Sequence, residues 1–200
     1  MRTSSWSLCP AILCVLAACA EPNAPRSLPL SPAPTLNNGN GIAIHVAGVG
    51  SADLSAFGLP PLDFHLVGQQ HNDGTAQGHF RFFRDSPTGT HDFEGVVTCL
   101  SVDPAFPGRA RIGGVITANH STAPTAQTAN HQVGDDVWFR MQDGVGHETV
   151  ESLTVLGFAP TLVNTSAEYC ALPFSGTVNG QNVWSSQIFP LLKGHLRVKS

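Results

Sequence analysis

The chain carries little charge. Only 12% of its 200 residues are charged, and the formal net charge at pH 7 is −4. It has no basic run and no alternation of basic and aromatic residues. Proteins that bind nucleic acid present strongly basic surfaces, so we expect no nucleic-acid partner.

The motifs of the common enzyme classes are also missing. There is no Gly-x-Ser-x-Gly, no P-loop and no dinucleotide-binding Gly-x-Gly-x-x-Gly in a strand–helix context. The nine histidines show neither His-x-His nor His-Glu-x-x-His spacing, so no zinc site is indicated. His147 and Glu148, with Asp143 and Glu151, could bind a cation, but solvated turn charges are the favoured interpretation. We expect no metal, no cofactor and no assignable catalytic residue.

No segment has the apolar spacing of an amphipathic helix of ten or more residues. Gly and Pro are abundant instead, with 20 and 15 residues, and short apolar runs alternate with polar positions. This pattern is typical of antiparallel strands joined by turns. The eight main strands are predicted at residues 42–49, 62–69, 76–82, 93–102, 109–118, 137–142, 153–157 and 192–199.

Antiparallel strands with one apolar face each must close on themselves or pair as two sheets. Eight is the number at which a closed barrel is just filled by side chains or holds one small ligand. We therefore predict an all-β, antiparallel fold of about eight strands, forming an up-and-down β-barrel, with a β-sandwich as the alternative. A small additional hairpin, turned by Asn179 and Gly180, is predicted between residues 174–178 and 181–184.

The N-terminus resembles the signal peptide of a bacterial lipoprotein. Arg2 precedes an apolar run too short to span a bilayer permanently, and that run ends in Leu16-Ala-Ala-Cys19, the form of a lipobox. The resemblance implies that residues 1–18 are removed and that Cys19 is acylated, which anchors the chain to the membrane. Ala20 follows where an Asp would indicate inner-membrane retention, which favours the outer membrane if the cell has two. The alternative is an ordinary secretory signal cut near Ala20.

Five prolines and the run Asn37-Asn-Gly-Asn40 follow the lipobox. This composition cannot bury a core, so residues 19–40 are predicted to form an extended tether. Residues 41–200 are predicted to form a single all-β domain, which is long enough to fold around its own core.

Five segments of the predicted domain carry a resemblance to a known group of proteins. They are Gly78-His-Phe80, Phe93-Glu-Gly-Val-Val-Thr-Cys-Leu100, Ala110-Arg-Ile-Gly-Gly-Val-Ile-Thr117, Trp138-Phe-Arg-Met-Gln-Asp-Gly144 and Pro190-Leu-Leu-Lys-Gly-His-Leu-Arg-Val198. Together they resemble a family of uncharacterised secreted bacterial proteins. The stretch after Asp143 is shorter here and lacks the usual Asn-Gly-Glu-Gly form. The resemblance implies an exported all-β domain and supplies no catalytic residue.

Cys99 and Cys170 are the only cysteines after Cys19. Exported proteins meet an oxidising compartment, where a disulfide between these two residues can form. Such a bridge would close a loop of about 70 residues and add roughly 4 kcal/mol by the loop-entropy argument. The alternative is a buried thiol at Cys99 in a strand and an unrelated loop cysteine at Cys170.

Basic side chains gather on the polar face of the predicted strands, whereas acids fall mostly in turns. In a closed barrel the last strand pairs with the first, which brings these side chains onto one outer wall. The candidate anion-binding residues are His45, His65, His79, Arg81, His195, Arg197 and Lys199. The outer face is also predicted to carry Arg109, Arg111, Arg140 and Lys193.

Such a wall would attract anionic polysaccharide or lipid headgroups, more strongly below about pH 6.5 as histidines gain charge. The alternative is a basic exterior that serves solubility and blocks edge pairing.

Three functions from different classes fit these features. A non-catalytic binding or adhesion module of the cell envelope is favoured. A lipocalin-like carrier of a small apolar ligand is the second, and it requires an interior void. The glycines that could create one on the apolar face are Gly78, Gly114, Gly157 and Gly194, although glycines also bend strands and relieve crowding. An enzyme of unrecognised type is the third.

Overall fold

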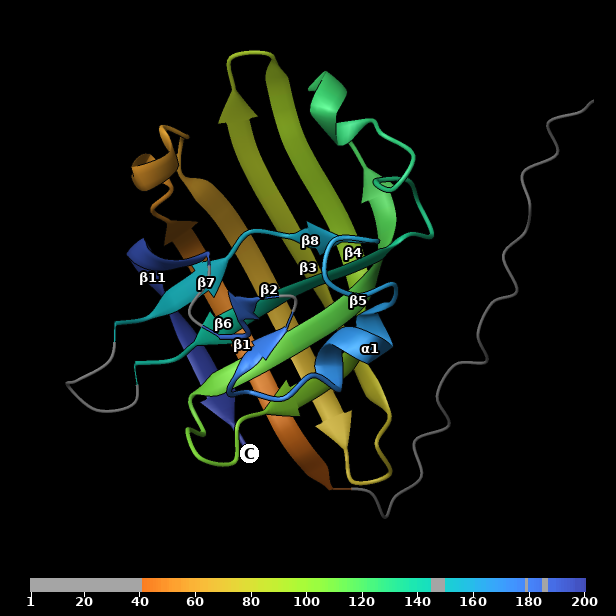
Figure 1. Ribbon diagram of the computed structural model, residues 1–200, viewed down its shortest axis with the longest axis vertical. Helices are drawn as coiled ribbons and strands as arrows, with labels where there is room; N and C mark the ends of the chain where they lie inside the picture. Colours follow the sequence, from red (N-terminus) through yellow and green to blue (C-terminus); the bar gives the residue numbers. More distant parts are fainter. Residues whose placement is uncertain (1–40, 145–149, 179, 185–186) are drawn as a thin grey trace, which may run out of the picture. The chain divides into compact units, whose positions relative to one another are not determined.

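The computed structural model describes residues 41–144, 150–178, 180–184 and 187–200. Regular structure in this part of the chain is almost entirely β-strand (Figure 1). The strands are β1 (Ile42–Ala52), β2 (Leu62–His71), β3 (Ala76–Ser86), β4 (Gly89–Val102), β5 (Arg109–Asn119), β6 (Asp136–Gln142), β7 (Ser152–Thr154), β8 (Gly157–Phe158), β9 (Thr177–Val178), β10 (Gln181–Asn182) and β11 (Ile188–Lys199). The helices are α1 (Ser166–Cys170) and the 3-10 helices η1 (Ser55–Phe57) and η2 (Pro124–Ala126).

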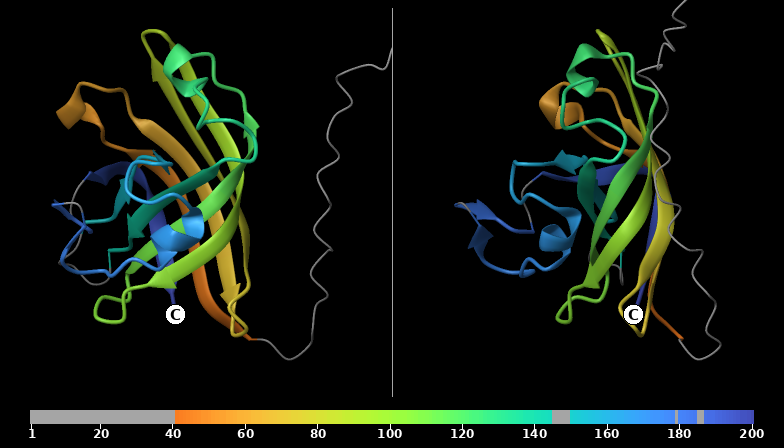
Figure 2. Two further views of the ribbon diagram at one scale, coloured as in Figure 1. Left: turned by 45° about the vertical axis from the view of Figure 1, so that its right-hand side comes forward. Right: turned by 90° about the vertical axis from the view of Figure 1, so that its right-hand side faces the viewer.

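Eight of these strands close a ring. From β1 to β6 each strand pairs antiparallel with the next along the chain, and β11 returns to pair with β1. The short strand β7 completes the ring between β6 and β11. The predicted antiparallel all-β fold of about eight strands is confirmed, and the ring is barrel-like (Figures 1 and 2).

Strict alternation decides which side chains fill the ring. On β2, Leu62, Phe64 and Leu66 are buried, whereas Asp63 and His65 between them are exposed. Successive side chains of a strand point to opposite faces of its sheet. The apolar set therefore packs inside the ring, and the polar set forms its outer wall.

Aromatic rings occupy the middle of the ring of strands. Phe80, Phe82 and Phe139 pack edge to face, with ring centroids 4.9 to 6.0 Å apart. Gly95 and Gly114 leave space for one of these rings. A Cβ atom on Gly95 would lie 2.1 Å from the Phe80 ring, and one on Gly114 would lie 2.8 Å from it.

The wall next to β6 is divided between two short strands. The alternation over residues 153–157 predicts one continuous strand, but β7 pairs with the end of β6 and β8 with its beginning. Val155 and Leu156, between the two, both pack against the core instead of alternating across a wall. Packing of both partly buried side chains against the core accounts for the interruption.

On the unpaired edge of β11, two main-chain N–H groups donate hydrogen bonds to side chains. After Pro190, β11 pairs only with β1 among the described residues. On its other edge, the carboxylate of Glu151 accepts a hydrogen bond from the Leu196 N–H at 3.3 Å, and that of Asp143 accepts one from the Val198 N–H at 3.0 Å. Two carboxylates thus replace part of the missing neighbouring strand.

Residues 166–184, apart from residue 179, cover one side of the ring, and we call them the covering segment (Figure 2). They include α1, which packs on β4, β5 and β6, and β9 and β10, which pair antiparallel as the predicted small hairpin. Thr165 caps α1 by accepting a hydrogen bond from the Glu168 N–H. The Cys99–Cys170 disulfide joins this segment to β4.

Candidate functional site

The first candidate surface is the outer wall of β11, β1, β2 and β3. We call residues that pair side by side across the four strands a row. The first row consists of His195, Val49, His65 and Arg81, each of which pairs with the next. The ring centroid of His65 also lies 5.2 Å from that of His79.

Two further rows extend the same surface. Arg197 and His79 occupy equivalent positions on the second row, on β11 and β3. Lys199 pairs directly with His45 on the third row. The structure therefore brings all seven predicted residues onto one wall. We call them the basic wall: His45, His65, His79, Arg81, His195, Arg197 and Lys199.

One end of the basic wall is neutralised by acids. Arg81 donates two hydrogen bonds to Asp92, at 3.0 and 2.8 Å, and its Nε lies 3.5 Å from a carboxylate oxygen of Glu94. The hydrogen bond to Asp92 and the charge of that carboxylate raise the pKa of Arg81. Arg81 thus adds little net positive charge to the surface, and the other six residues carry its basic character.

Arg111 and Arg140 lie on the outer face, as predicted, but they are buried there and do not belong to this exposed surface. They pair across β5 and β6 on the outer face, but the covering segment buries both. Arg111 donates to the carbonyl oxygens of Pro173 and Val183 at 2.7 and 3.1 Å, and Arg140 donates to Val183 at 2.6 Å. Their role here is to hold the covering segment by its main chain.

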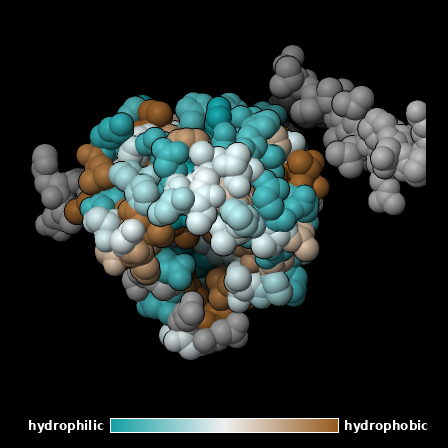
Figure 3. All heavy atoms as spheres, turned by 90° about the horizontal axis from the view of Figure 1, so that it is seen from above, coloured by the Kyte–Doolittle hydropathy of each residue, from teal (hydrophilic) through white to brown (hydrophobic). Residues whose placement is uncertain are grey.

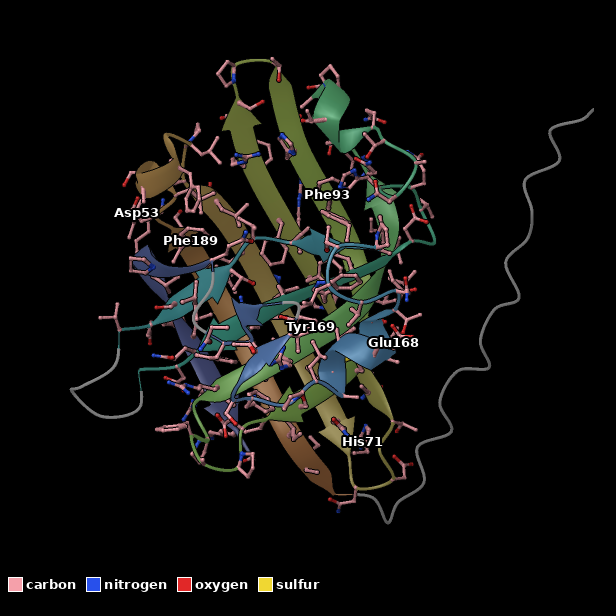
Figure 4. All side chains as sticks on the ribbon, viewed as in Figure 1. Asp53, His71, Phe93, Glu168, Tyr169 and Phe189 are labelled. Carbon is pink, nitrogen blue, oxygen red and sulfur yellow. A yellow bond between two sulfur atoms is a disulfide. The ribbon has the colours of Figure 1, made fainter. Side chains whose placement is uncertain are left out.

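Aromatic rings complete the setting of these buried cations. The Arg111 guanidinium lies 5.0 Å from the ring centroids of both Tyr169 and Phe174, a range in which cation–π attraction operates. Burial lowers the pKa of Arg111 and of Arg140, and burial also raises the pKa of Tyr169. Figure 4 shows Tyr169 on the covering segment, over the ring strands.

The remaining predicted sites have separate outcomes. Cys19 lies outside the described residues, as do His147 and Glu148 of the candidate cation site. Asp143 and Glu151, the other two residues of that candidate site, accept hydrogen bonds from main-chain N–H groups of β11. In the described ranges, no group of three or more His, Cys, Asp or Glu side chains could hold a metal ion.

The four glycines that could create an interior void lie close to neighbouring atoms, so an added Cβ atom would clash at each of them. A Cβ on Gly78 or on Gly194 would lie 2.1 Å from a main-chain oxygen of the neighbouring strand, and one on Gly157 would lie 2.3 Å from the Trp138 indole nitrogen. Together with Gly114 against Phe80, these positions permit close approach of backbones and rings.

A second candidate site lies at the upper end of the ring in Figure 1, and we call it the upper cleft. It has a volume of 260 Å³ and lies between the β3–β4 hairpin, the chain after η1, the loop containing η2, and β8. Seen from above, this end shows hydrophobic residues among hydrophilic ones (Figure 3). Its apolar lining includes Leu62, Phe82, Phe93 and Phe158.

Three nitrogen-bearing side chains enter this apolar lining. Arg84 and His91 pair directly across β3 and β4, and His131 approaches from the loop after η2. The His131 ring packs edge-on against Phe158 with centroids 4.0 Å apart, and Phe158 lies 5.6 Å from Phe93. Figure 4 shows Phe93 on β4 beside β8.

Burial in the upper cleft disfavours the charged forms of its three basic side chains. Burial lowers the pKa of Arg84. Burial also lowers the pKa of His91, and the charges of Arg84 and His131 lower it further. Burial lowers the pKa of His131, with Asp135 opposing the shift. The Nη1 atom of Arg84 is buried and has no hydrogen-bond partner in the described part of the chain.

The alternation of residues in the sequence extends into this cleft, beyond the end of the predicted strand. Phe80, Phe82 and Arg84 follow one another at a period of two, as do His91 and Phe93. Extending the alternation by one step past Phe82 places Arg84 on the inner face. The predicted strand ends at residue 82, whereas β3 continues to Ser86 and so includes Arg84.

No helix in the described part of the chain could span a bilayer. Comparisons of the chain with protein-family models, with curated proteins and with solved structures find no match.

Proposed function

We propose that this chain is a lipid-anchored, non-catalytic binding module of the bacterial cell envelope. The run Leu16-Ala-Ala-Cys19 supports export and acylation, and the proline-rich residues 19–40 support a tether between the lipid and the domain. The resemblance of the domain to secreted bacterial proteins agrees with this location. In a cell with two membranes, Ala20 favours the outer one.

The basic wall is the proposed binding surface, and its ligand is an acidic polysaccharide of the envelope. The observation that carries this proposal is the strand register, which sets basic side chains from β11, β1, β2 and β3 in neighbouring rows. On this wall, the ion pairs formed by the described residues are those of Arg81 with Asp92 and Glu94. Arg197, Lys199 and the four histidines therefore remain available to a polyanion. Anionic lipid headgroups are the alternative ligand, because the tether keeps the domain near a membrane.

The first prediction concerns Arg197 and Lys199. The double variant Arg197→Gln/Lys199→Gln should bind heparin, used as the acidic polysaccharide, about 30-fold more weakly than the natural domain at low salt. This figure assumes about 1 kcal/mol for each cation near an anionic surface. Binding should be measured by calorimetry at low and at high salt, and it should be weaker at high salt because dissolved ions screen exposed charges.

The matched control is Arg81→Gln, which removes a cation already paired with Asp92 and should weaken binding much less. Anionic phosphatidylglycerol vesicles form a second arm, and preference for vesicles over heparin would assign the wall to lipid headgroups. Absence of heparin and vesicle binding at low salt, or equal binding by the double variant, would exclude the basic wall as the functional surface.

A further inference from the structure

One guanidinium nitrogen in the upper cleft lacks an acceptor among the described residues. Arg84, which is partly buried, reaches the cleft from the inner face of β3, and its Nη1 atom is buried without a hydrogen-bond partner in that part of the chain. A buried donor without a partner is costly. Its outward-facing neighbour Arg81 has two carboxylates. A ligand that brings an acceptor to Arg84 would remove this cost.

The chemistry around Arg84 indicates the charge of that ligand. His91 and His131 have pKa values lowered by burial, so near neutral pH both are mainly uncharged and Arg84 is the principal cation. One guanidinium matches one carboxylate, with which it forms two parallel hydrogen bonds. A dianionic phosphate would find less counter-charge. Thr125 also lines the upper cleft. Its Oγ1 lies 3.5 Å from His91 Nε2, and its hydroxyl adds a neutral hydrogen-bond donor.

The rest of the lining indicates the body of the ligand. Phe82, Phe93 and Phe158 present aromatic surface, and Leu59 and Leu62 present aliphatic surface. Small-molecule sites commonly combine an apolar lining with a few convergent polar groups. A volume of 260 Å³ falls slightly below the usual range for drug-sized ligands, which favours a short chain or a single ring.

We infer that the upper cleft binds a small organic carboxylate with an apolar body, the carboxylate on Arg84 and the body against Phe93 and Phe158. The site is distinct from the basic wall, since Arg84 and Arg81 lie on opposite faces of β3. It does not require a hollow ring, because the ligand sits above the aromatic core. A monoanionic amphiphile is therefore a second ligand, independent of any polysaccharide.

The test uses residues 41–200 with and without the preceding tether, and sodium octanoate as the probe. Calorimetry should detect octanoate binding to both forms, and octan-1-ol, which lacks the charge, should bind at least tenfold more weakly. Arg84→Gln should weaken octanoate binding at least tenfold, in line with loss of a hydrogen bond to a charged group. The control Arg109→Gln, at the start of β5 and outside the lining of the cleft, should leave octanoate binding unchanged.

Nuclear magnetic resonance locates the ligand independently of these variants. Octanoate should shift the imidazole signals of His91 and His131 and leave those of His65 and His195 on the basic wall unmoved. If Arg84→Gln does not fold, this readout and the comparison with octan-1-ol still decide the question. Binding of octan-1-ol as tight as that of octanoate, shifts confined to the basic wall, or no octanoate binding at millimolar concentration would each overturn the inference.

Discussion

At the scale of single residues, the ring of Phe80 and two facing glycines define the middle of the core. Gly95 and Gly114 lie on the two strands that follow β3, and each would bring a Cβ within 3 Å of the Phe80 ring. Protein interiors are close-packed, so the ring cannot move without displacing Phe82 and Phe139. The glycines are thus part of the packing of an aromatic core.

The substitution Gly95→Ala should therefore lower the free energy of unfolding by about 1 to 3 kcal/mol, the usual cost of overpacking. Its added methyl group would meet the Phe80 ring and the main chain of β5. Combining it with Phe80→Leu should cost less than the sum of the two single substitutions, because a smaller side chain admits the methyl group. Urea denaturation of the three variants measures this coupling.

Val96→Thr is the control, since Val96 is 43% exposed on the outer face of the same strand. It should change stability by no more than about 0.5 kcal/mol. Strict additivity of Gly95→Ala and Phe80→Leu would show that the methyl group and the ring do not compete for space.

At the scale of elements, the covering segment is held to the ring by three kinds of contact. Arg111 and Arg140 donate to its carbonyl oxygens, aromatic rings pack on Arg111, and the disulfide joins Cys170 of α1 to Cys99 of β4. The first two act only in the folded chain. The disulfide also constrains the unfolded chain, because its cysteines are 71 residues apart in sequence.

Removing the disulfide should therefore destabilise the whole domain and not only the covering segment. The double substitution Cys99→Ser/Cys170→Ser should reduce the free energy of unfolding by about 4 kcal/mol on the loop-entropy estimate. The measurement is the denaturation midpoint with and without a thiol reductant. Reductant should lower the midpoint of the natural chain and leave that of the double variant unaltered. Equal midpoints for the natural chain in both conditions would contradict a structural bridge.

At the scale of the whole molecule, the proposed location depends on one cysteine. Cys19→Ser should abolish incorporation of labelled palmitate and release the domain from the membrane fraction, because acyl chains supply the anchoring energy. Cys14→Ser is the control, since position 14 lies within the segment expected to be removed, and it should leave labelling intact. Retention of Cys19→Ser in the membrane fraction with unchanged mass would show that Cys19 is not the anchor.

Much of the fold could be predicted from the sequence because alternation is a local property. The period of two along Leu62–Leu66 assigns each side chain to a face without knowledge of its neighbours. Pairing of the last strand with the first then follows from closing the ring, which places Lys199 beside His45. The basic wall could be foreseen for this reason, although the neutralisation of Arg81 by Asp92 depends on a cross-strand neighbour.

An all-β chain of about eight strands, the faces of most of those strands and the small hairpin of β9 and β10 follow from the sequence. The burial of Arg111 and Arg140 by the covering segment, the contact of Cys99 with Cys170 and the apolar cleft around Arg84 and His91 appear only in the folded chain. These features join residues far apart in the chain or lie where a strand ends. Residue-by-residue alternation carries no information about what packs on a face, so non-local contacts decide whether an outward arginine is exposed or buried.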